Sequence, residues 1–504
     1  MSSTTVADKR SSSGNDGVIR TLIPARLDRL PWSRFHTRVV MALGVAWILD
    51  GLEITFASNF VPNLQSKASL GISTRAGSDI ASVYLIGQVI GALVFGRLSD
   101  RLGRKNLFVY TLGLYLVANG VAAFSPNLIW LDACRVIAGM GIGGEYAAIN
   151  SAVDELIPSK HRGRVDIGIN GTYWAGAAIA SLAGVYLLDP AHVSENLGWR
   201  ITLLIGPALG ATVWFVRRTL PESPRWLITH GREDEAEANT AEIEQWVRDN
   251  GHDLPDVDDD KAIEIDPKHS RPSMWQVTKV LIAVYPKRSL LGASLMITQS
   301  FLYNAIFFTY AQVLTTFFHV SDGHTAYYYV AFAVGNLAGP LLLGPLFDTV
   351  GRRFMISSTY IVAAVLLAIT SVAFDHGLLT ATTQTLCWSV IFFFASAGAS
   401  AAYLTVSEIF PMELRAQAIA VFFSIAQGFG ALGPAVYGGF IASKSPHELM
   451  LGYFLGAGVM AVGGVIAAVF GISAERTALE DVANPLSLVK GSPGGQAATA
   501  PAAG

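Results

Sequence analysis

The chain has 504 residues, of which 52% are hydrophobic and only 14% are charged, and its formal net charge is −3. Soluble domains carry about 25% charged residues, so this composition indicates a membrane protein. The two cysteines, Cys134 and Cys387, both lie in apolar segments, which excludes a secreted disulfide scaffold.

The chain begins with a polar, basic tail at residues 1–35 and continues with long apolar segments. A bilayer core of about 30 Å needs roughly 20 apolar residues in a helix. These segments lack the alternating pattern of a barrel, and a lipid-exposed backbone must satisfy its own hydrogen bonds. The sequence therefore predicts an all-α membrane protein with twelve transmembrane helices, near residues 37–62, 78–97, 105–124, 128–156, 164–188, 198–216, 287–317, 325–346, 354–374, 381–409, 414–442 and 448–471.

These helices form two groups. Residues 36–217 and 286–473 each hold six helices, and the acid-rich segment 218–285 separates them. Within that segment, residues 233–247 predict a surface helix whose charges form a solvated face, and a regulatory partner site is the alternative. The tail at 474–504 is rich in Gly, Ala and Pro, which is typical of a disordered segment.

Lysine and arginine are concentrated in the N-terminal tail and in the even-numbered joints between helices, as in Arg97, Arg101 and Arg104 of the second joint. By the positive-inside rule we expect both termini on the cytoplasmic side of the plasma membrane. The basic tail is then explained by topology, and we expect no nucleic-acid partner.

Two motifs occur once in each half. GRLSDRLGRK at 96–105 returns as GPLFDTVGRR at 344–353, and DELIPSKHR at 154–162 returns as SEIFPMELR at 407–415. Such a repeat implies two pseudo-symmetric six-helix bundles with a path between them. We expect the charged members to form a cytoplasmic gate that opens and closes, and the alternative is a static interfacial staple. The predicted gate residues are Asp100, Arg104, Glu155, Arg162, Asp348, Arg352, Glu408 and Arg415.

The motifs also carry a family resemblance. GRLSDRLGRK resembles the signature loop between helices 2 and 3 of the major facilitator superfamily. PESPRWL at 221–227 resembles the motif after helix 6 in the sugar-porter-like branch of that superfamily. The resemblance implies the major facilitator fold, alternating access by rocking of two bundles, and no covalent chemistry. On this basis we expect a transporter and not an enzyme.

The stretch WILDGLEITFAS at 47–58 places Asp50 and Glu53 inside an apolar segment. They lie three residues apart on one helical face, and Asp50 is near the middle of the membrane. A charge there is costly unless it is paired, hydrated or protonated. We therefore predict proton coupling by Asp50, Glu53 and Glu145, the last within GGEY; a structural ion pair with Arg135 is the alternative. DGLE resembles the DGxD element of aromatic-acid/proton symporters, and GGEY resembles metabolite/proton symporters.

Candidates for substrate binding lie in both halves. Arg135 is placed to hold a carboxylate by a two-pronged hydrogen bond or to pair with Glu53, and its counterpart in the repeat is Trp388. MITQSFLYNAIFFTY at 296–310 resembles the sugar-binding helix 7 of sugar porters in its Gln and Asn spacing. The aromatic candidates either line the cavity or pack in the core. The predicted substrate-binding residues are Arg135, Asn170, Trp174, Gln299, Tyr303, Asn304 and Trp388.

Together these features predict a proton-coupled secondary active transporter that carries a small polar metabolite, an organic acid or related anion, across the lipid bilayer. A sugar uniporter or symporter, and a non-transporting nutrient receptor that signals through 218–285, are the alternatives. The sequence has no GxxxxGK[ST], HExxH or paired CxxC motif. We therefore expect no cofactor and no metal, with a proton gradient as the driving force, and we expect a monomer.

Overall fold

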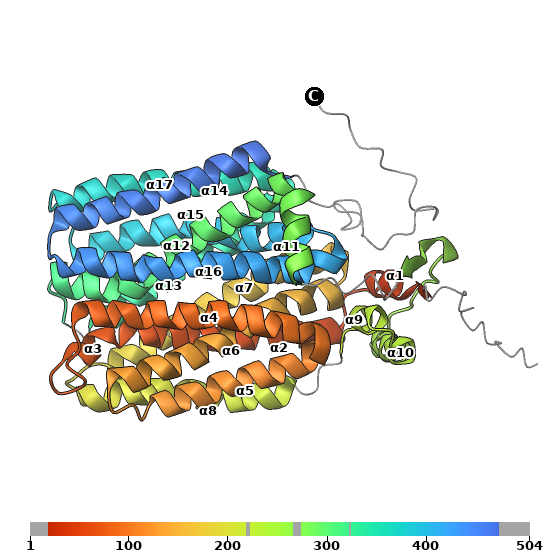
Figure 1. Cartoon of the computed structure of the whole chain (residues 1–504), viewed down its shortest axis with the longest axis horizontal. Helices are drawn as coiled ribbons and strands as arrows, with labels where there is room; N and C mark the ends of the chain where they lie inside the picture. Colours follow the sequence, from red (N-terminus) through yellow and green to blue (C-terminus); the bar gives the residue numbers. More distant parts are fainter. Residues whose placement is uncertain (1–18, 218–221, 266–273, 322–323, 473–504) are drawn as a thin grey trace, which may run out of the picture.

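The computed structural model describes residues 19–217, 222–265, 274–321 and 324–472, apart from some side chains within helices. Twelve long helices in this part of the chain run side by side in two layers (Figure 1). The first layer holds α2 (Arg34–Asn59), α4 (Thr74–Leu102), α5 (Arg104–Ala122), α6 (Leu128–Leu156), α7 (Ser159–Leu187) and α8 (Glu195–Arg217). The second holds α12 (Pro286–Phe317), α13 (Thr325–Thr349), α14 (Arg352–Asp375), α15 (Ala381–Glu408), α16 (Met412–Ala442) and α17 (Pro446–Phe470).

The predicted organisation of twelve helices is therefore confirmed. The span predicted at 128–156 is α6, and the span predicted at 381–409 is α15. Among the described residues, eight helices are long and apolar enough to cross a membrane by length and composition alone. The other four, α5 to α8, lie beside α2 and α4 in the first layer (Figure 1).

The glycine in the repeated loop motif has the same backbone role in both halves. Gly103 precedes α5 with a φ of 85°, and Gly351 precedes α14 with a φ of 114°. Both values lie in the left-handed region, which glycine adopts without a steric penalty. The repeat thus fixes a tight turn between the second and third helices of each half.

The contacts between helices also repeat. In the first half α2 packs on α7 and α4 on α6, and in the second half α12 packs on α16 and α13 on α15. The two halves meet along two corresponding lines, where α4 contacts α16 and α7 contacts α13. These contacts give the two bundles the pseudo-symmetry that the sequence repeat predicts.

Four glycines, which we call the glycine seam, join α4 to α6. A Cβ atom added to Gly87 or Gly91 on α4, or to Gly139 or Gly143 on α6, would overlap a backbone carbonyl oxygen of the facing helix. Small residues at such positions let membrane helices approach backbone to backbone. The seam therefore holds α4 and α6 in close contact.

Shorter elements gather at one end of the bundle, which we call the loop end (Figure 1). They are β1 (Ile19–Thr21), α1 (Ile23–Asp28), α9 (Pro224–Thr229), α10 (Glu233–Asp249), η1 (Asp259–Lys261), β2 (Ile263–Ile265) and α11 (Met274–Ala283); α3 (Val61–Gln65) lies at the opposite end. β1 and β2 pair in an antiparallel sheet, with Ile19 opposite Ile265. The helix predicted at 233–247 is α10.

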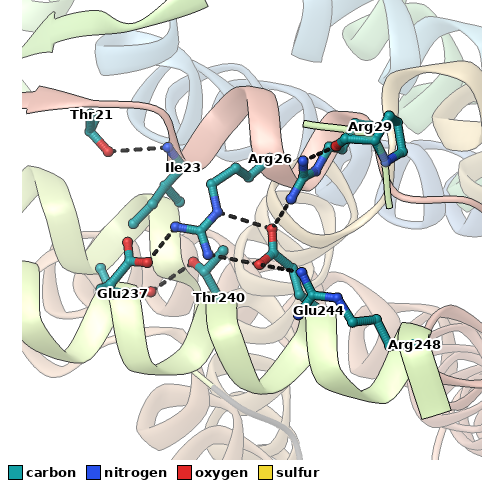
Figure 2. Close-up of polar contacts among 10 residues, drawn as sticks. Thr21, Ile23, Arg26, Arg29, Glu237, Thr240, Glu244 and Arg248 are labelled. Carbon is teal, nitrogen blue, oxygen red and sulfur yellow. Dashed lines mark hydrogen bonds and ion pairs between the residues drawn. The ribbon is translucent and has the colours of Figure 1, made fainter. Parts of the chain in front are cut away.

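We expected the charged face of α10 to be solvated. Part of it instead binds the N-terminal segment (Figure 2). Arg26 on α1 donates two hydrogen bonds to the Glu244 carboxylate, from Nε at 3.0 Å and from Nη2 at 2.8 Å. Arg29 Nη2 donates a third, at 2.6 Å, and the Glu244 side chain is only 5% exposed. Arg225 on α9 pairs with Asp28 at 2.9 Å. We call the contacts of Arg26 and Arg29 with Glu244 the loop clamp.

The loop clamp is also attached to the first transmembrane helix. The Arg38 guanidinium on α2 lies 4.8 Å from the centre of the Trp246 ring on α10. Phe35 meets the same ring edge-on at 6.0 Å. These contacts place α10 against the start of α2.

Candidate functional site

A cavity of about 120 Å³ lies between the two halves. Helices α2, α4, α6 and α7 supply one wall, and α12, α15 and α16 supply the other. Its lining is aromatic and amide-rich, and the described lining residues include no Asp, Glu, Lys or Arg. They are Trp47, Ile54, Tyr84, Leu85, Gln88, Tyr146, Asn170, Tyr173, Trp174, Gln299, Ser300, Tyr303, Asn304, Phe307, Phe308, Ser396, Ala399, Ser400, Tyr403 and Gln427.

Aromatic rings join the two walls of the cavity. Trp174 on α7 lies 5.9 Å from Tyr303 and 5.8 Å from Phe307, both on α12. Trp47 and Tyr146 meet edge-on at 4.4 Å within the first half. Such edge-to-face and offset arrangements are the favoured geometry of aromatic pairs. The lining therefore offers aromatic faces and edges against which a flat ring can pack.

Amide side chains cross the cavity as well. Gln427 on α16 donates from Nε2 to the Gln88 Oε1 on α4, and its own oxygen accepts from Ser300. Asn304 Nδ2 donates to the Ser300 carbonyl at 2.8 Å. Gln88 was not among the predicted site residues, although a glutamine in the middle of an apolar span is a detectable signal.

A buried polar chain lies behind the wall formed by the first half. Asn119 on α5 donates from Nδ2 to the Glu53 carboxylate, and Arg135 Nη1 on α6 donates to Asn119 Oδ1 at 2.9 Å. Glu53 is 3% exposed and Arg135 is 2% exposed. The predicted association of Glu53 with Arg135 therefore runs through Asn119 among the described contacts. We call these three residues the acid–base chain.

The acid–base chain is close to the cavity without lining it. The Arg135 guanidinium lies 4.5 Å from the centre of the Tyr84 ring, and Tyr84 is a lining residue. Asp50 and Glu145 are also buried, and neither lines the cavity. Asp50 is close enough to Tyr84, Tyr146 and Tyr173 to interact with them electrostatically.

The predicted substrate-binding residues divide into two groups. Asn170, Trp174, Gln299, Tyr303 and Asn304 line the cavity. Arg135 stands behind Tyr84, as described above. Trp388 is fully buried in the second half, where its ring packs 4.7 Å from Tyr310 and 5.3 Å from Tyr453. The role of each remains a prediction.

Only part of the predicted gate falls on described side chains. Arg352 forms an ion pair with Glu408 at the loop end of the second half, and both are buried. Glu155 lies near the end of α6 and is partly exposed. The side chains of the other five predicted members lie outside the described residues: Asp100, Arg104, Arg162, Asp348 and Arg415.

The two halves contact each other on both sides of the cavity. Away from the loop end, Ser78 Oγ on α4 donates to Gln312 Oε1 on α12 at 2.6 Å, and Gln312 Nε2 donates to the Thr74 carbonyl at 3.0 Å. Toward the loop end, a Cβ on Gly96 of α4 would lie 3.2 Å from the Ala420 Cβ on α16.

Comparison with known proteins gives consistent matches. The family model described as "Sugar (and other) transporter" matches residues 39–484. The chain is 34% identical over 222 residues to the niacin transporter NiaP of Acinetobacter baylyi, covering 44% of this chain and 48% of that protein. It is 33% identical over 309 residues to the putative metabolite transport protein YdjK of Escherichia coli, covering 58% and 61%. These matches span about half and about three fifths of the two relatives.

Solved structures show the same architecture. The proton:xylose symporter XylE bound to 6-bromo-6-deoxy-D-glucose superposes with a TM-score of 0.69 at 17% identity, over 89% of this chain and 98% of that chain. An inward-open XylE from E. coli gives a TM-score of 0.65 at 18% identity, over 89% and 98%. The resemblance at this identity concerns the fold.

Proposed function

Because the chain belongs to the sugar (and other) transporter family of the major facilitator superfamily, we propose that it is a proton-coupled transporter of a small organic acid. The observation that carries the proposal is the acid–base chain, buried directly behind a cavity between two bundles. Ionisable groups inside a membrane domain are costly and usually serve transport. The matched relatives are named as transporters and not as enzymes.

In the proposed mechanism Glu53 is the group that takes up the proton. While Glu53 is ionised, its negative charge balances Arg135 through Asn119. When Glu53 binds a proton, the positive charge on Arg135 becomes available to a substrate carboxylate. Asp50 and Glu145 lie nearby and extend the route by which a proton reaches Glu53. Rocking of the bundles then carries proton and substrate across together.

For the substrate we propose a flat carboxylic acid of one ring. The aromatic lining favours a ring, the amides favour polar edges, and about 120 Å³ admits a small molecule. The relative from A. baylyi is named as a niacin transporter. A sugar is the second candidate, because Gln299, Asn304 and Gln427 offer the amides that hydroxyl groups require.

We further propose that the loop end faces the cytoplasm of a plasma membrane and that the chain acts as a monomer. The arginines of α1 and of the start of α2 favour this orientation by the positive-inside rule. The Arg352–Glu408 ion pair at the loop end supports a gate on that side.

To test the mechanism, the purified full chain is reconstituted in liposomes, and niacin uptake is driven by a pH gradient that is acidic outside. Glu53→Gln should lower gradient-driven accumulation at least tenfold while retaining exchange of niacin at equal concentrations on both sides, because only the coupling is lost. Asp50→Asn should also lower gradient-driven accumulation, but to a smaller extent than Glu53→Gln.

Glu448→Gln makes the same chemical change at an exposed acid at the start of α17 and is the matched control. Niacin accumulation at the wild-type level in Glu53→Gln would show that Glu53 is not the group that takes up the proton. If the wild-type protein neither binds nor transports niacin but does bind xylose, the sugar hypothesis replaces the organic acid.

A further inference from the structure

Tyr84 contacts both the cavity and the acid–base chain. Tyr84 lines the cavity, whereas Arg135 does not, and the guanidinium lies over the Tyr84 ring at 4.5 Å from its centre. Tyr84 is 1% exposed and Arg135 is 2% exposed. A cation over a ring face is attracted to it, and this attraction keeps the ring in place.

The Tyr84 backbone is fixed while its side chain adjoins open space. A Cβ on Gly139 would overlap the Tyr84 carbonyl oxygen, so Tyr84 belongs to the tight contact between α4 and α6. Its side chain faces the cavity on one side. Rotation of the ring about χ1 or χ2 would therefore move it away from Arg135 without a shift of the α4 backbone.

Arg135 has unused hydrogen-bonding capacity on the far side of that ring. Among the described residues, its side chain donates one hydrogen bond, to Asn119, and its buried Nε has no partner. A guanidinium carries five N–H donors arranged as a fork that fits a carboxylate. The cavity contains no Lys or Arg among its described lining residues, and Arg135, which lies against the lining residue Tyr84, is a buried cation that could hold an anionic group.

We propose that Tyr84 is a movable wall that covers a second, anion-binding subsite at Arg135, reached by the carboxylate of a substrate whose ring occupies the cavity. This proposal rests on the proposed function. Within the same site, it assigns to Arg135 the selection of a negatively charged substrate.

The acids around the subsite make the entry of an anion depend on protonation. Asp50 and Glu53 on α2 and Glu145 on α6 are the nearby acids, and the hydroxyls of Tyr115 and Tyr146 adjoin them. An anion entering next to ionised acids is repelled, so the carboxylate reaches Arg135 when Glu53 has taken up one proton from water. Tyr84 keeps Arg135 covered at other times and thus prevents uptake of the anion without the proton.

Two experiments test the wall in the full chain. In the first, niacin and nicotinamide are the probes, since they share a ring and differ in the carboxylate charge. Tyr84→Leu should lower the ratio of the Kd for niacin to the Kd for nicotinamide at least tenfold at pH 7, because the loss of a lining ring affects both probes whereas the exposure of Arg135 favours only the carboxylate. Tyr84→Phe keeps the ring and should match the wild type, and adding Arg135→Gln to Tyr84→Leu should abolish the gain.

Tyr403→Leu is the matched control, because Tyr403 lines the opposite wall on α15. A Tyr84→Leu effect that is equal for both probes, or one that Tyr403→Leu reproduces, would overturn the proposal. If the wild-type chain binds neither probe, the proposed substrate class fails, and the second experiment still decides the role of Tyr84.

The second experiment needs no substrate. Phenylglyoxal modifies accessible arginines, and mass spectrometry measures its reaction with the peptide that contains Arg135. Tyr84→Leu should raise that rate at least tenfold over the wild type, Tyr84→Phe and Tyr403→Leu. Equal rates in all four proteins, each with an unchanged melting temperature, would show that Tyr84 does not cover Arg135.

Discussion

At the scale of single residues, the position of Glu53 depends on the absence of a side chain opposite it. A Cβ on Gly206 of α8 would overlap the Glu53 carboxylate. The acid is thus held between Gly206 and the Asn119 amide, at a place where an unpaired charge would be costly. Gly206 provides the space, and Asn119 provides the hydrogen bond to Arg135.

We predict that Gly206→Ala displaces Glu53 from Asn119. The added methyl group should destabilise the protein by about 1–3 kcal/mol, as overpacking of a filled core does, and lower niacin accumulation at least tenfold. Thermal unfolding and liposome uptake measure the two effects. Gly113→Ala on α5 is the control, since nothing lies within 4 Å of its Cβ position, and it should be neutral. Equal behaviour of the two variants would contradict the assigned role of Gly206.

A sequence pattern shows which residues share a face of one helix, but it does not show which residues of different helices meet. Spacing on one helix placed Asp50 and Glu53 together, because residues three apart share a face. Asn119 and Gly206 lie on other helices, and no local pattern distinguishes them from packing residues. Gln88 was detectable in principle, but only the packing of α4 on α16 explains why it faces Gln427.

At the scale of elements, the loop clamp joins segments that are more than two hundred residues apart. Glu244 accepts from Arg26 and Arg29, and Arg26 also pairs with the exposed Glu237 (Figure 2). Hydrogen bonds to charged groups contribute about 1.5–3 kcal/mol, whereas exposed ion pairs contribute about 1 kcal/mol or less. Glu244 is therefore the residue on which the docking of α1 depends.

We predict that Glu244→Gln loosens α1 from α10. A loss of about 2 kcal/mol corresponds to roughly thirtyfold more opening, which hydrogen exchange of the α1 and β1 amides will measure. Glu235→Gln, on the same helix with an exposed partner in Arg232, should leave the exchange unchanged. Unaltered exchange in Glu244→Gln would show that β-strand pairing alone holds the segment.

The same clamp predicts a pH dependence. Burial opposes ionisation of Glu244, but the hydrogen bonds and charges of Arg26 and Arg29 outweigh it and lower its pKa below the usual value. The unfolded pKa of a glutamate is about 4.3. A lowered folded pKa stabilises the clamp fully above that value and loses the contribution as pH falls through the folded pKa. Protection of α1 should thus be constant from about pH 8 to 5 and fall below about pH 4; a loss already at pH 6 would contradict it.

Sequence predicted the long elements better than the short ones. Apolar length and polar joints fix where a transmembrane helix begins and ends, which is why α6 matches its predicted span. The segments β1 and α1 have no such signal, because they are ordered by partners on α9, α10 and β2. A charged helix such as α10 looks solvated until its partner is known.

At the scale of the whole molecule, the two halves contact each other on both sides of the cavity. Alternating access requires that these contacts break in turn, at one end and then at the other. The line between α4 and α16 passes through both regions, with Ser78 near Gly438 away from the loop end and Gly96 near Ala420 toward it.

We predict that disulfides across this line stop transport. A Cβ on Gly96 would lie 3.2 Å from the Ala420 Cβ, and one on Gly438 would lie 2.6 Å from the Ser78 Cβ, so each pair must separate slightly to reach the Cβ–Cβ distance of about 3.8 Å in disulfides. After replacement of Cys134 and Cys387 by serine, each cysteine pair should lower uptake roughly tenfold on oxidation and recover it on reduction. Single-cysteine variants should be unaffected, and full transport in either oxidised pair would contradict rocking at that end.

The glycine seam makes α4 and α6 move as one stiff lever. With 29 residues, α4 is about 44 Å long, so a tilt of about 10° around its midpoint would displace each tip by roughly 4 Å in opposite directions. The close backbone contact at the four glycines resists sliding of the two helices, so little of that tilt is lost inside the first half. Tyr84 and Gln88 lie near the midpoint of α4. A small shift beside them therefore produces a larger displacement of the helix ends at both membrane surfaces.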